Sequence, residues 1–233
     1  ESVMLGFYAM WKGPENDVCD KLGIQKRNEI GMGYSRDGFH FYRPTYEPIM
    51  GVNETDGAWN WGNMQSIIGV PLIVGDSLYL YSSGRMKNDV MWDGFTSTGM
   101  ATLRRDGFVS MQTPGQGFLT TGNIKFDGKY FFVNVQVKNL QVEILDEKGK
   151  VIPGFSKDDC EALKDLNSTK QMVTWKSGKD LSSLADKVVK IKFYVTDGDL
   201  YAFWISPWKT GESRGYTGGG GPGLNPAGID KPL

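Results

Sequence analysis

Strict alternation of apolar and polar residues is the feature that most limits the fold of this chain. In residues 131–137 and 189–195 every second residue is apolar, and the residues between them include Asn134 and Lys192. Residues 140–144 repeat the pattern. Strands with one apolar and one polar face are typical of antiparallel sheets. The sequence therefore predicts an all-β fold, with turns of helix expected only in 157–166 and 181–185.

The tetrapeptide Arg-Asp-Gly-Phe occurs twice, at 36–39 and 105–108, and each copy follows an aromatic strand and a second strand. Asp-Gly supplies the positive φ of a hairpin turn, and strand, loop, strand, turn, strand is the order of a β-propeller blade. We therefore expect about two blades in residues 1–115. Because propellers close with roughly 4–8 blades, an upstream segment or a partner chain is expected to complete the ring.

After residue 115 the pattern changes to short alternating strands separated by turns, one of them expected at Asp197-Gly198. This predicts an antiparallel β-sandwich of about seven to nine strands over residues 116–206. Residues 207–233 are rich in glycine and proline, a composition typical of a flexible C-terminal tail.

Charge and cysteine content argue against several functions. The formal net charge is −1, whereas a nucleic-acid-binding protein has a basic surplus. The longest apolar run, residues 67–75, is far shorter than a membrane span. Cys19 and Cys160 are the only cysteines and form no CxxC pair; we expect two buried free thiols, with a long-range disulfide as the alternative. No metal or cofactor site is predicted.

Two regions resemble a known family. Residues 31–44, GMGYSRDGFHFYRP, are similar to the blade hairpin of glycoside hydrolase family 32 and its five-bladed propeller relatives. Residues 151–160, 173–178, 180–185 and 200–204 resemble the β-sandwich that follows that propeller. The resemblance implies a secreted, periplasmic or cell-surface protein that hydrolyses an oligo- or polysaccharide with two carboxylates.

The family's Trp-Met-Asn-Asp-Pro nucleophile motif is absent from this chain, as are its Arg-Asp-Pro and Glu-Cys motifs. We therefore expect the catalytic carboxylates in blades outside it. The predicted function is part of a glycoside hydrolase-like protein. The alternative is a non-catalytic glycan-binding or surface-assembly protein on the same scaffold, and a purely structural protein is a third hypothesis.

The candidate ligand site is the stretch 56–66, DGAWNWGNMQS, between the two predicted blades. Tryptophan rings stack on sugar faces, and amide side chains bind hydroxyl groups; otherwise these residues pack between blades and satisfy loop backbone. Arg85 is expected either to bind a carboxylate or sulfate of an acidic sugar or to form a structural ion pair. The predicted substrate-binding residues are Trp59, Asn60, Trp61, Asn63, Gln65 and Arg85.

Glu29 is the one candidate catalytic residue, as a general acid whose pKa burial would set. The alternative is a surface carboxylate paired with a neighbouring base. Asp37 and Asp106 are predicted to be turn residues that bind their own backbone. Asp93 belongs to a third Asp-Gly pair, either a turn or part of a loop at the mouth of the propeller funnel.

Overall fold

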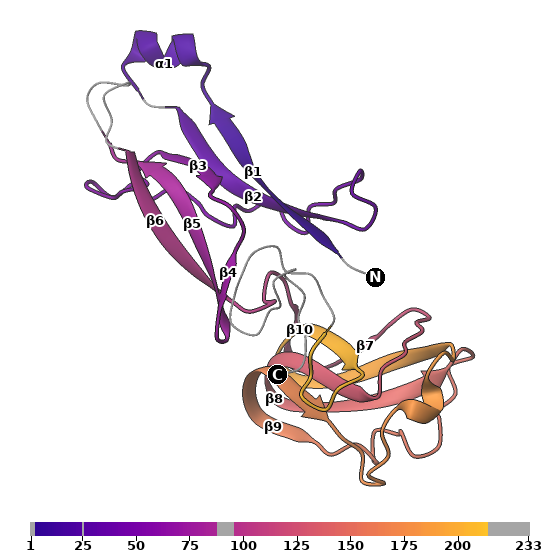
Figure 1. Ribbon diagram of the computed structural model, residues 1–233. Helices are drawn as coiled ribbons and strands as arrows, with labels where there is room; N and C mark the ends of the chain where they lie inside the picture. Colours follow the sequence, from indigo (N-terminus) through magenta and orange to yellow (C-terminus); the bar gives the residue numbers. More distant parts are fainter. Residues whose placement is uncertain (1–2, 25, 88–95, 214–233) are drawn as a thin grey trace. The chain divides into compact units, whose positions relative to one another are not determined.

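The computed structural model describes residues 3–24, 26–87 and 96–213. These residues form ten strands, one α-helix and one 3₁₀ helix (Figure 1), so the all-β prediction is confirmed. The chain divides into two compact units, residues 1–103 and 104–233. The division precedes the predicted boundary at 115/116, and strand β7 (Met111–Thr120) runs across that boundary.

The first unit is a six-stranded sheet made of two antiparallel groups. Its strand order is β1-β2-β3-β5-β4, and β6 also pairs with β5. A single parallel residue pair, Asn28 with Asn63, joins the two groups. Its elements are β1 (Met4–Gly13), α1 (Asn16–Leu22), β2 (Arg27–Ser35), β3 (Asn63–Ile67), β4 (Leu72–Val74), β5 (Ser77–Arg85) and β6 (Thr96–Arg104).

Helix α1 occupies the connection between β1 and β2, which was expected to be a loop (Figure 1). Gly23 ends the helix with φ 62, and its N–H bonds to the last turn. This left-handed C-terminal cap suits glycine because it has no Cβ. The helix buries Cys19, which is unpaired, as is the buried Cys160 of the second unit.

The two Arg-Asp-Gly-Phe copies lie in different contexts. In the first, Gly38 has φ 80, Ser35 Oγ donates to Asp37 Oδ1 at 3.0 Å, and the chain returns to pair Tyr42 with Tyr34. In the second, Asp106 has φ 52, and the chain continues into β7 of the other sheet. Both are turns, as predicted, but only the first returns to its own sheet.

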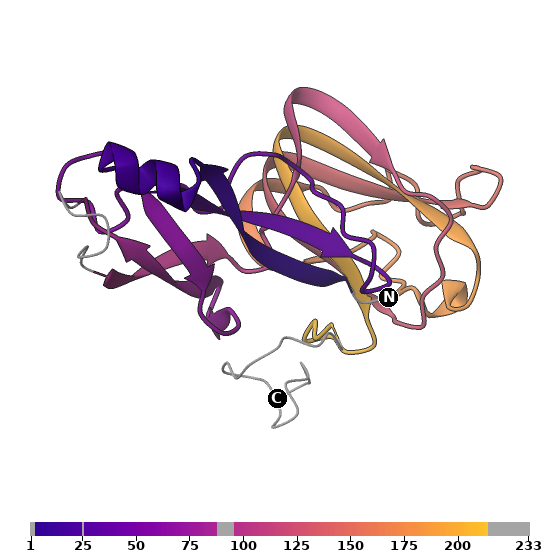
Figure 2. The ribbon, with the colours of Figure 1, turned by 90° about the horizontal axis from the view of Figure 1, so that it is seen from above.

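The second unit is one strongly curved antiparallel sheet with the strand order β7-β10-β8-β9 (Figures 1 and 2). The remaining elements are β8 (Tyr130–Asp146), β9 (Leu163–Val173), the 3₁₀ helix η1 (Ser182–Leu184) and β10 (Val189–Ser206). Within the described residues the unit has four strands rather than the seven to nine expected. The helical turn expected at 181–185 is confirmed by η1. In the other stretch expected to be helical, 157–166, the residues from Leu163 onward belong to β9 instead.

One reason for the smaller number of strands is that Asp197-Gly198 is a bulge and not a turn. Asp197 has φ 43 and Gly198 has φ 154, and the register of β10 with β7 shifts between Thr196 and Gly198. A bulge bends a strand and lets pairing continue beyond it. Pairing accordingly runs from Val189 to Ser206 along β10.

This irregularity also changes which face of β8 and β10 is buried. The β8 residues that belong to the hydrophobic core are odd-numbered up to Val137 and even-numbered from Leu140, and those of β10 change in the same way between Val195 and Leu200. The resulting core contains 18 buried residues. They are Phe131, Val133, Val135, Val137, Leu140, Val142, Ile144, Phe155, Cys160, Val173, Trp175, Leu181, Leu184, Val189, Ile191, Phe193, Val195 and Leu200.

Candidate functional site

Three of the predicted binding residues meet where β2, β3 and β5 lie side by side. Asn63 begins β3, pairs with Asn28 of β2 and lies opposite Arg85 at the end of β5. Directly opposed residues on paired strands present their side chains to the same face of the sheet. Asn28, Asn63, Gln65 and Arg85 are called the Asn63 cluster below.

Amide hydrogen bonds connect this cluster. Asn28 Nδ2 donates to Asn63 Oδ1 at 3.3 Å, and Gln65 Nε2 donates to the same oxygen at 2.5 Å. Asn63 Nδ2 in turn donates to the carbonyl of Lys26 at 3.3 Å. Asn28 and Asn63 are buried, whereas Gln65 and Arg85 are partly exposed. The asparagines therefore form a fixed base beneath two side chains that solvent can reach.

Arg85 is the member of the Asn63 cluster with unused hydrogen-bonding capacity. Its Nε is buried and has no acceptor among the described residues. Leaving a buried N–H unpaired costs about 1–3 kcal/mol. A guanidinium presents several N–H donors in one plane, so Arg85 is suited to donate hydrogen bonds to the oxygen atoms of a ligand.

Asn60 and Trp61 organise the loop 51–62 instead of joining the Asn63 cluster. Asn60 Nδ2 donates to the carbonyl of Gly51 at 3.1 Å, and the Asn60 carbonyl accepts from the Asn53 N–H at 3.2 Å. Trp61 Nε1 donates to the carbonyl of Glu54 at 3.2 Å. Asn60 therefore matches the alternative expected for the amides, in which their side chains form hydrogen bonds with the loop backbone.

The two tryptophans have different surroundings. The Trp59 ring lies against Gly84 and Gly99, where a Cβ would lie 2.7 Å and 2.2 Å from ring carbons. Trp59 also packs on the small core of Ile30, Met50 and Met64. Its place in the structure is thus a packing position.

Trp61 is partly exposed, and the ammonium of Lys87 lies 5.5 Å from the centre of its ring. The same ammonium is 2.9 Å from an oxygen of Asp56. One face of the indole is therefore occupied by a cation whose own partner lies in the same loop. A sugar stacking on that face would displace Lys87.

Glu29 is held in an ion pair. Its Oε2 lies 3.1 Å from Lys12 Nζ, and 16% of its side chain is exposed. Lys12 is on the neighbouring strand, where Met10 pairs with Glu29. This is the arrangement that the alternative reading of Glu29 predicted, a carboxylate paired with a nearby base. Among the described residues no group of three or more His, Cys, Asp and Glu side chains could hold a metal ion.

A second concave feature lies at the first Arg-Asp-Gly-Phe turn. Tyr34, Arg36, Asp37, His40 and Tyr42 line a cavity of about 280 Å³. Asp37 Oδ1 accepts the backbone N–H groups of His40 and Phe39 at 2.8 and 2.9 Å, and Asp37 Oδ2 lies 2.6 Å from His40 Nδ1. The backbone hydrogen bond from His40, followed by that from its ring, holds the pKa of Asp37 far below its usual range.

Asn28 was not among the predicted site residues, although its neighbour Glu29 was. Alternation along a strand places these two side chains on opposite faces. The contact that brings Asn28 to the Asn63 cluster is the single parallel pair between β2 and β3, which no local pattern predicts. Asp93 lies outside the described residues.

None of the helices in the described parts of the chain has the length and apolarity that a bilayer crossing requires. Comparison with known proteins found no matching family model, no matching curated protein and no matching solved structure.

Proposed function

We propose that the first unit binds a saccharide through the Asn63 cluster, as part of a glycoside hydrolase-like carbohydrate-active protein. The observation that carries this proposal is the unpaired guanidinium N–H of Arg85 beside the linked amides of Asn63 and Gln65. Amides both donate and accept hydrogen bonds, and a guanidinium donates several. Such groups on a rigid sheet suit the hydroxyl and ring oxygens of a sugar.

Binding without cleavage is the form of this proposal that the site favours. Glycoside hydrolysis uses two carboxylates on either side of the glycosidic bond. The candidate acid Glu29 has its Oε2 engaged by Lys12, and the Asn63 cluster contains amides and a guanidinium but no carboxylate. A catalytic pair would then have to come from blades outside this chain.

Two blades of a larger propeller remain the architecture that we propose for the first unit, followed by the curved four-stranded sheet of the second unit, in a protein at the cell surface or outside the cell. Its two antiparallel groups joined by one residue pair support this interpretation. So does its surface, where Leu5, Trp11 and Phe41 are 39%, 53% and 50% exposed. Further strands, from another segment or a partner chain, would cover these side chains.

Titration of the full chain with a panel of neutral and acidic oligosaccharides tests the proposal, with calorimetry as the readout. At least one member should bind, and Arg85→Ala should weaken its binding about tenfold or more, the effect of removing a charged hydrogen-bond donor. Arg43→Ala is the matched control, because Arg43 stacks on Tyr46 outside the cluster. Unchanged binding by a folded Arg85→Ala variant would exclude this site.

A further inference from the structure

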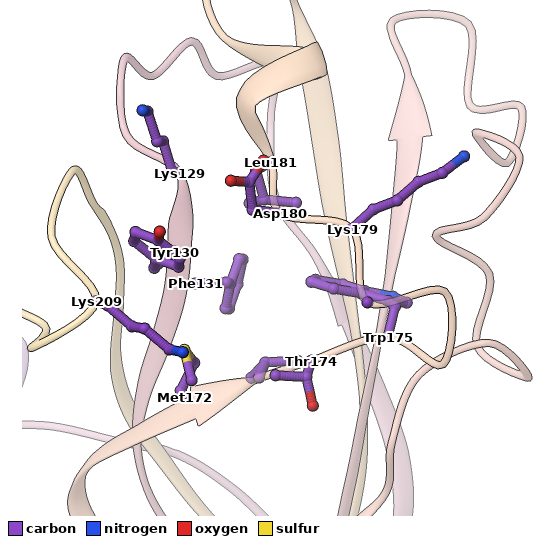
Figure 3. A pocket seen from close by; sticks show the side chains of 12 residues that line it. Lys129, Tyr130, Phe131, Met172, Thr174, Trp175, Lys179, Asp180, Leu181 and Lys209 are labelled. Carbon is purple, nitrogen blue, oxygen red and sulfur yellow. The ribbon is translucent and has the colours of Figure 1, made fainter.

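The second unit contains a cavity of about 210 Å³ that none of the predicted site residues reaches (Figure 3). Residues at the start of β8, at the end of β9 and in the segment 178–181 line it. Phe131, Val173, Trp175 and Leu181 supply its apolar wall, and all four are buried. The volume is below the roughly 300–1,000 Å³ of pockets for drug-sized ligands, so it suits one small ring.

Trp175 is held in a fixed position in this cavity wall. The residue is 3% exposed, and its ring packs edge-on against Phe131 and Phe155, with ring centres 6.2 and 5.2 Å away. Its Nε1 is buried and has no acceptor among the described residues. Because the ring is held on two sides, its orientation is set before any ligand arrives, and it contributes a rigid aromatic surface to the wall.

The rim of the cavity is positively charged. Lys129, Lys179 and Lys209 line it with one acidic residue, Asp180 (Figure 3). Asp180 Oδ1 accepts the backbone N–H of Ser182 at 2.9 Å, which commits it to its own turn. None of the three ammonium groups is within 4.0 Å of a carboxylate in the described parts of the chain. They are long, exposed side chains that can turn toward an anion.

We propose that this cavity binds a small sugar acid, with the ring against the aromatic wall and the carboxylate among the lysines. Apolar walls with a few placed polar groups are typical of small-molecule sites, and a rim of three lysines and one aspartate has a net positive charge that favours anions. The site is in a different unit from the Asn63 cluster and does not depend on the function proposed there.

The test is a titration of the ¹⁵N-labelled full chain with glucuronate, glucose and inorganic sulfate, followed through the indole N–H signals. Trp175→Phe assigns the Trp175 signal. Glucuronate should shift that signal, and glucose and sulfate should each bind about tenfold or more weakly. The triple variant Lys129→Gln, Lys179→Gln, Lys209→Gln should lose about tenfold in glucuronate affinity, as expected for removal of rim charges.

The control triple variant Lys148→Gln, Lys164→Gln, Lys187→Gln removes the same charge from exposed lysines that do not line the cavity, and it should bind glucuronate like the parent chain. No shift of the Trp175 signal with glucuronate, or equal loss in both triple variants, would overturn the proposal. Equal affinity for sulfate and glucuronate would identify a free oxyanion as the ligand and overturn the sugar assignment. Loss of saccharide binding in Arg85→Ala alone leaves this site unaffected, so the two proposals fail separately.

Discussion

The two units of this chain bury the apolar side chains of their sheets to very different extents. In the described residues the hydrophobic cluster of the second unit contains 18 buried residues, whereas that of the first contains three, Ile30, Met50 and Met64, and a few further buried apolar residues such as Leu78 and Leu80 lie outside it. Exposed large apolar side chains show the opposite distribution, since sixteen of twenty belong to the first unit. The two sheets therefore differ in how much of their apolar surface is covered by residues of the same unit.

This difference indicates where the stability of each unit comes from. Burying apolar surface contributes roughly 25 cal/mol per Å², so the curved sheet of the second unit carries its own driving force for folding. The first unit relies more on backbone pairing and on the buried amides of Asn28 and Asn63. A sheet with an open edge and uncovered apolar side chains gains most from additional strands, which is the physical content of the propeller proposal.

The largest expected effect is in the second core. Phe193→Ala should destabilise the second unit by about 3–5 kcal/mol, because Phe193 is fully buried and its removal leaves a cavity. Urea denaturation followed by tryptophan fluorescence measures the change. Phe118→Ala is the control in the same sheet, because Phe118 is 71% exposed; similar losses in both would contradict the assigned core.

The boundary between the units gives the next prediction. Arg104, the last residue of β6, is the first residue of the second unit and bonds within it: its Nε donates to Asn134 Oδ1 at 2.6 Å, and its Nη2 donates to the Val135 carbonyl at 3.0 Å. Arg104→Ala should cost about 2–3 kcal/mol, because it leaves acceptors of the buried Asn134 and Val135 without a donor. Denaturation midpoints of the second unit report the loss, and Lys125→Ala is the control; an unchanged midpoint would place the boundary elsewhere.

Trp59 allows the small first core to be tested. Gly99→Ala should destabilise the first unit by about 1–3 kcal/mol, because the new methyl group would overlap the Trp59 ring. Thermal unfolding measures the effect. Gly122→Ala is the control, since a Cβ there meets nothing within 4 Å. Equal tolerance of both changes would mean that Trp59 is free to move, as a ligand-stacking residue would be.

The smallest expected effect concerns the buried thiol of the second unit. Burial raises the pKa of Cys160 from 9.0 to about 11. Because the folded state holds this proton more tightly than the unfolded state, stability should be full below pH 9 and fall as the pH rises toward 11, by roughly 1–2 kcal/mol. Unfolding free energies measured across this pH range for the parent and Cys160→Ala give the difference; a pH dependence that survives the substitution would assign it to another group.

Local patterns predicted the strands because alternation reports directly on the buried face. The same patterns could not distinguish Asp37-Gly38, which turns the chain, from Asp197-Gly198, which is a bulge in a continuous strand. The distinction depends on distant residues, since a Cβ at Gly198 would lie 2.0 Å from the Gln136 carbonyl oxygen on β8. The pairing with a distant strand thus decides whether an Asp-Gly dipeptide forms a turn or a bulge.

The candidate site shows the same limit. Residue type and position pointed to Asn63, Gln65 and Arg85, and the structure brings these three together. Asn28 was missed because a parallel contact between β2 and β3 supplies it. Asn60 was included because its side chain is of the right type, although its hydrogen bond to Gly51 uses it within the loop.

Native-state hydrogen exchange on the full chain tests the difference between the units most directly. Amides in a well-buried sheet exchange only through large unfolding events, whereas those in a poorly covered sheet exchange through smaller ones. The account predicts that amides of β8 and β10 are protected by a larger free energy than amides of β1, β2 and β5. Equal protection in the two sheets would contradict it, because the first unit would then be as self-sufficient as the second.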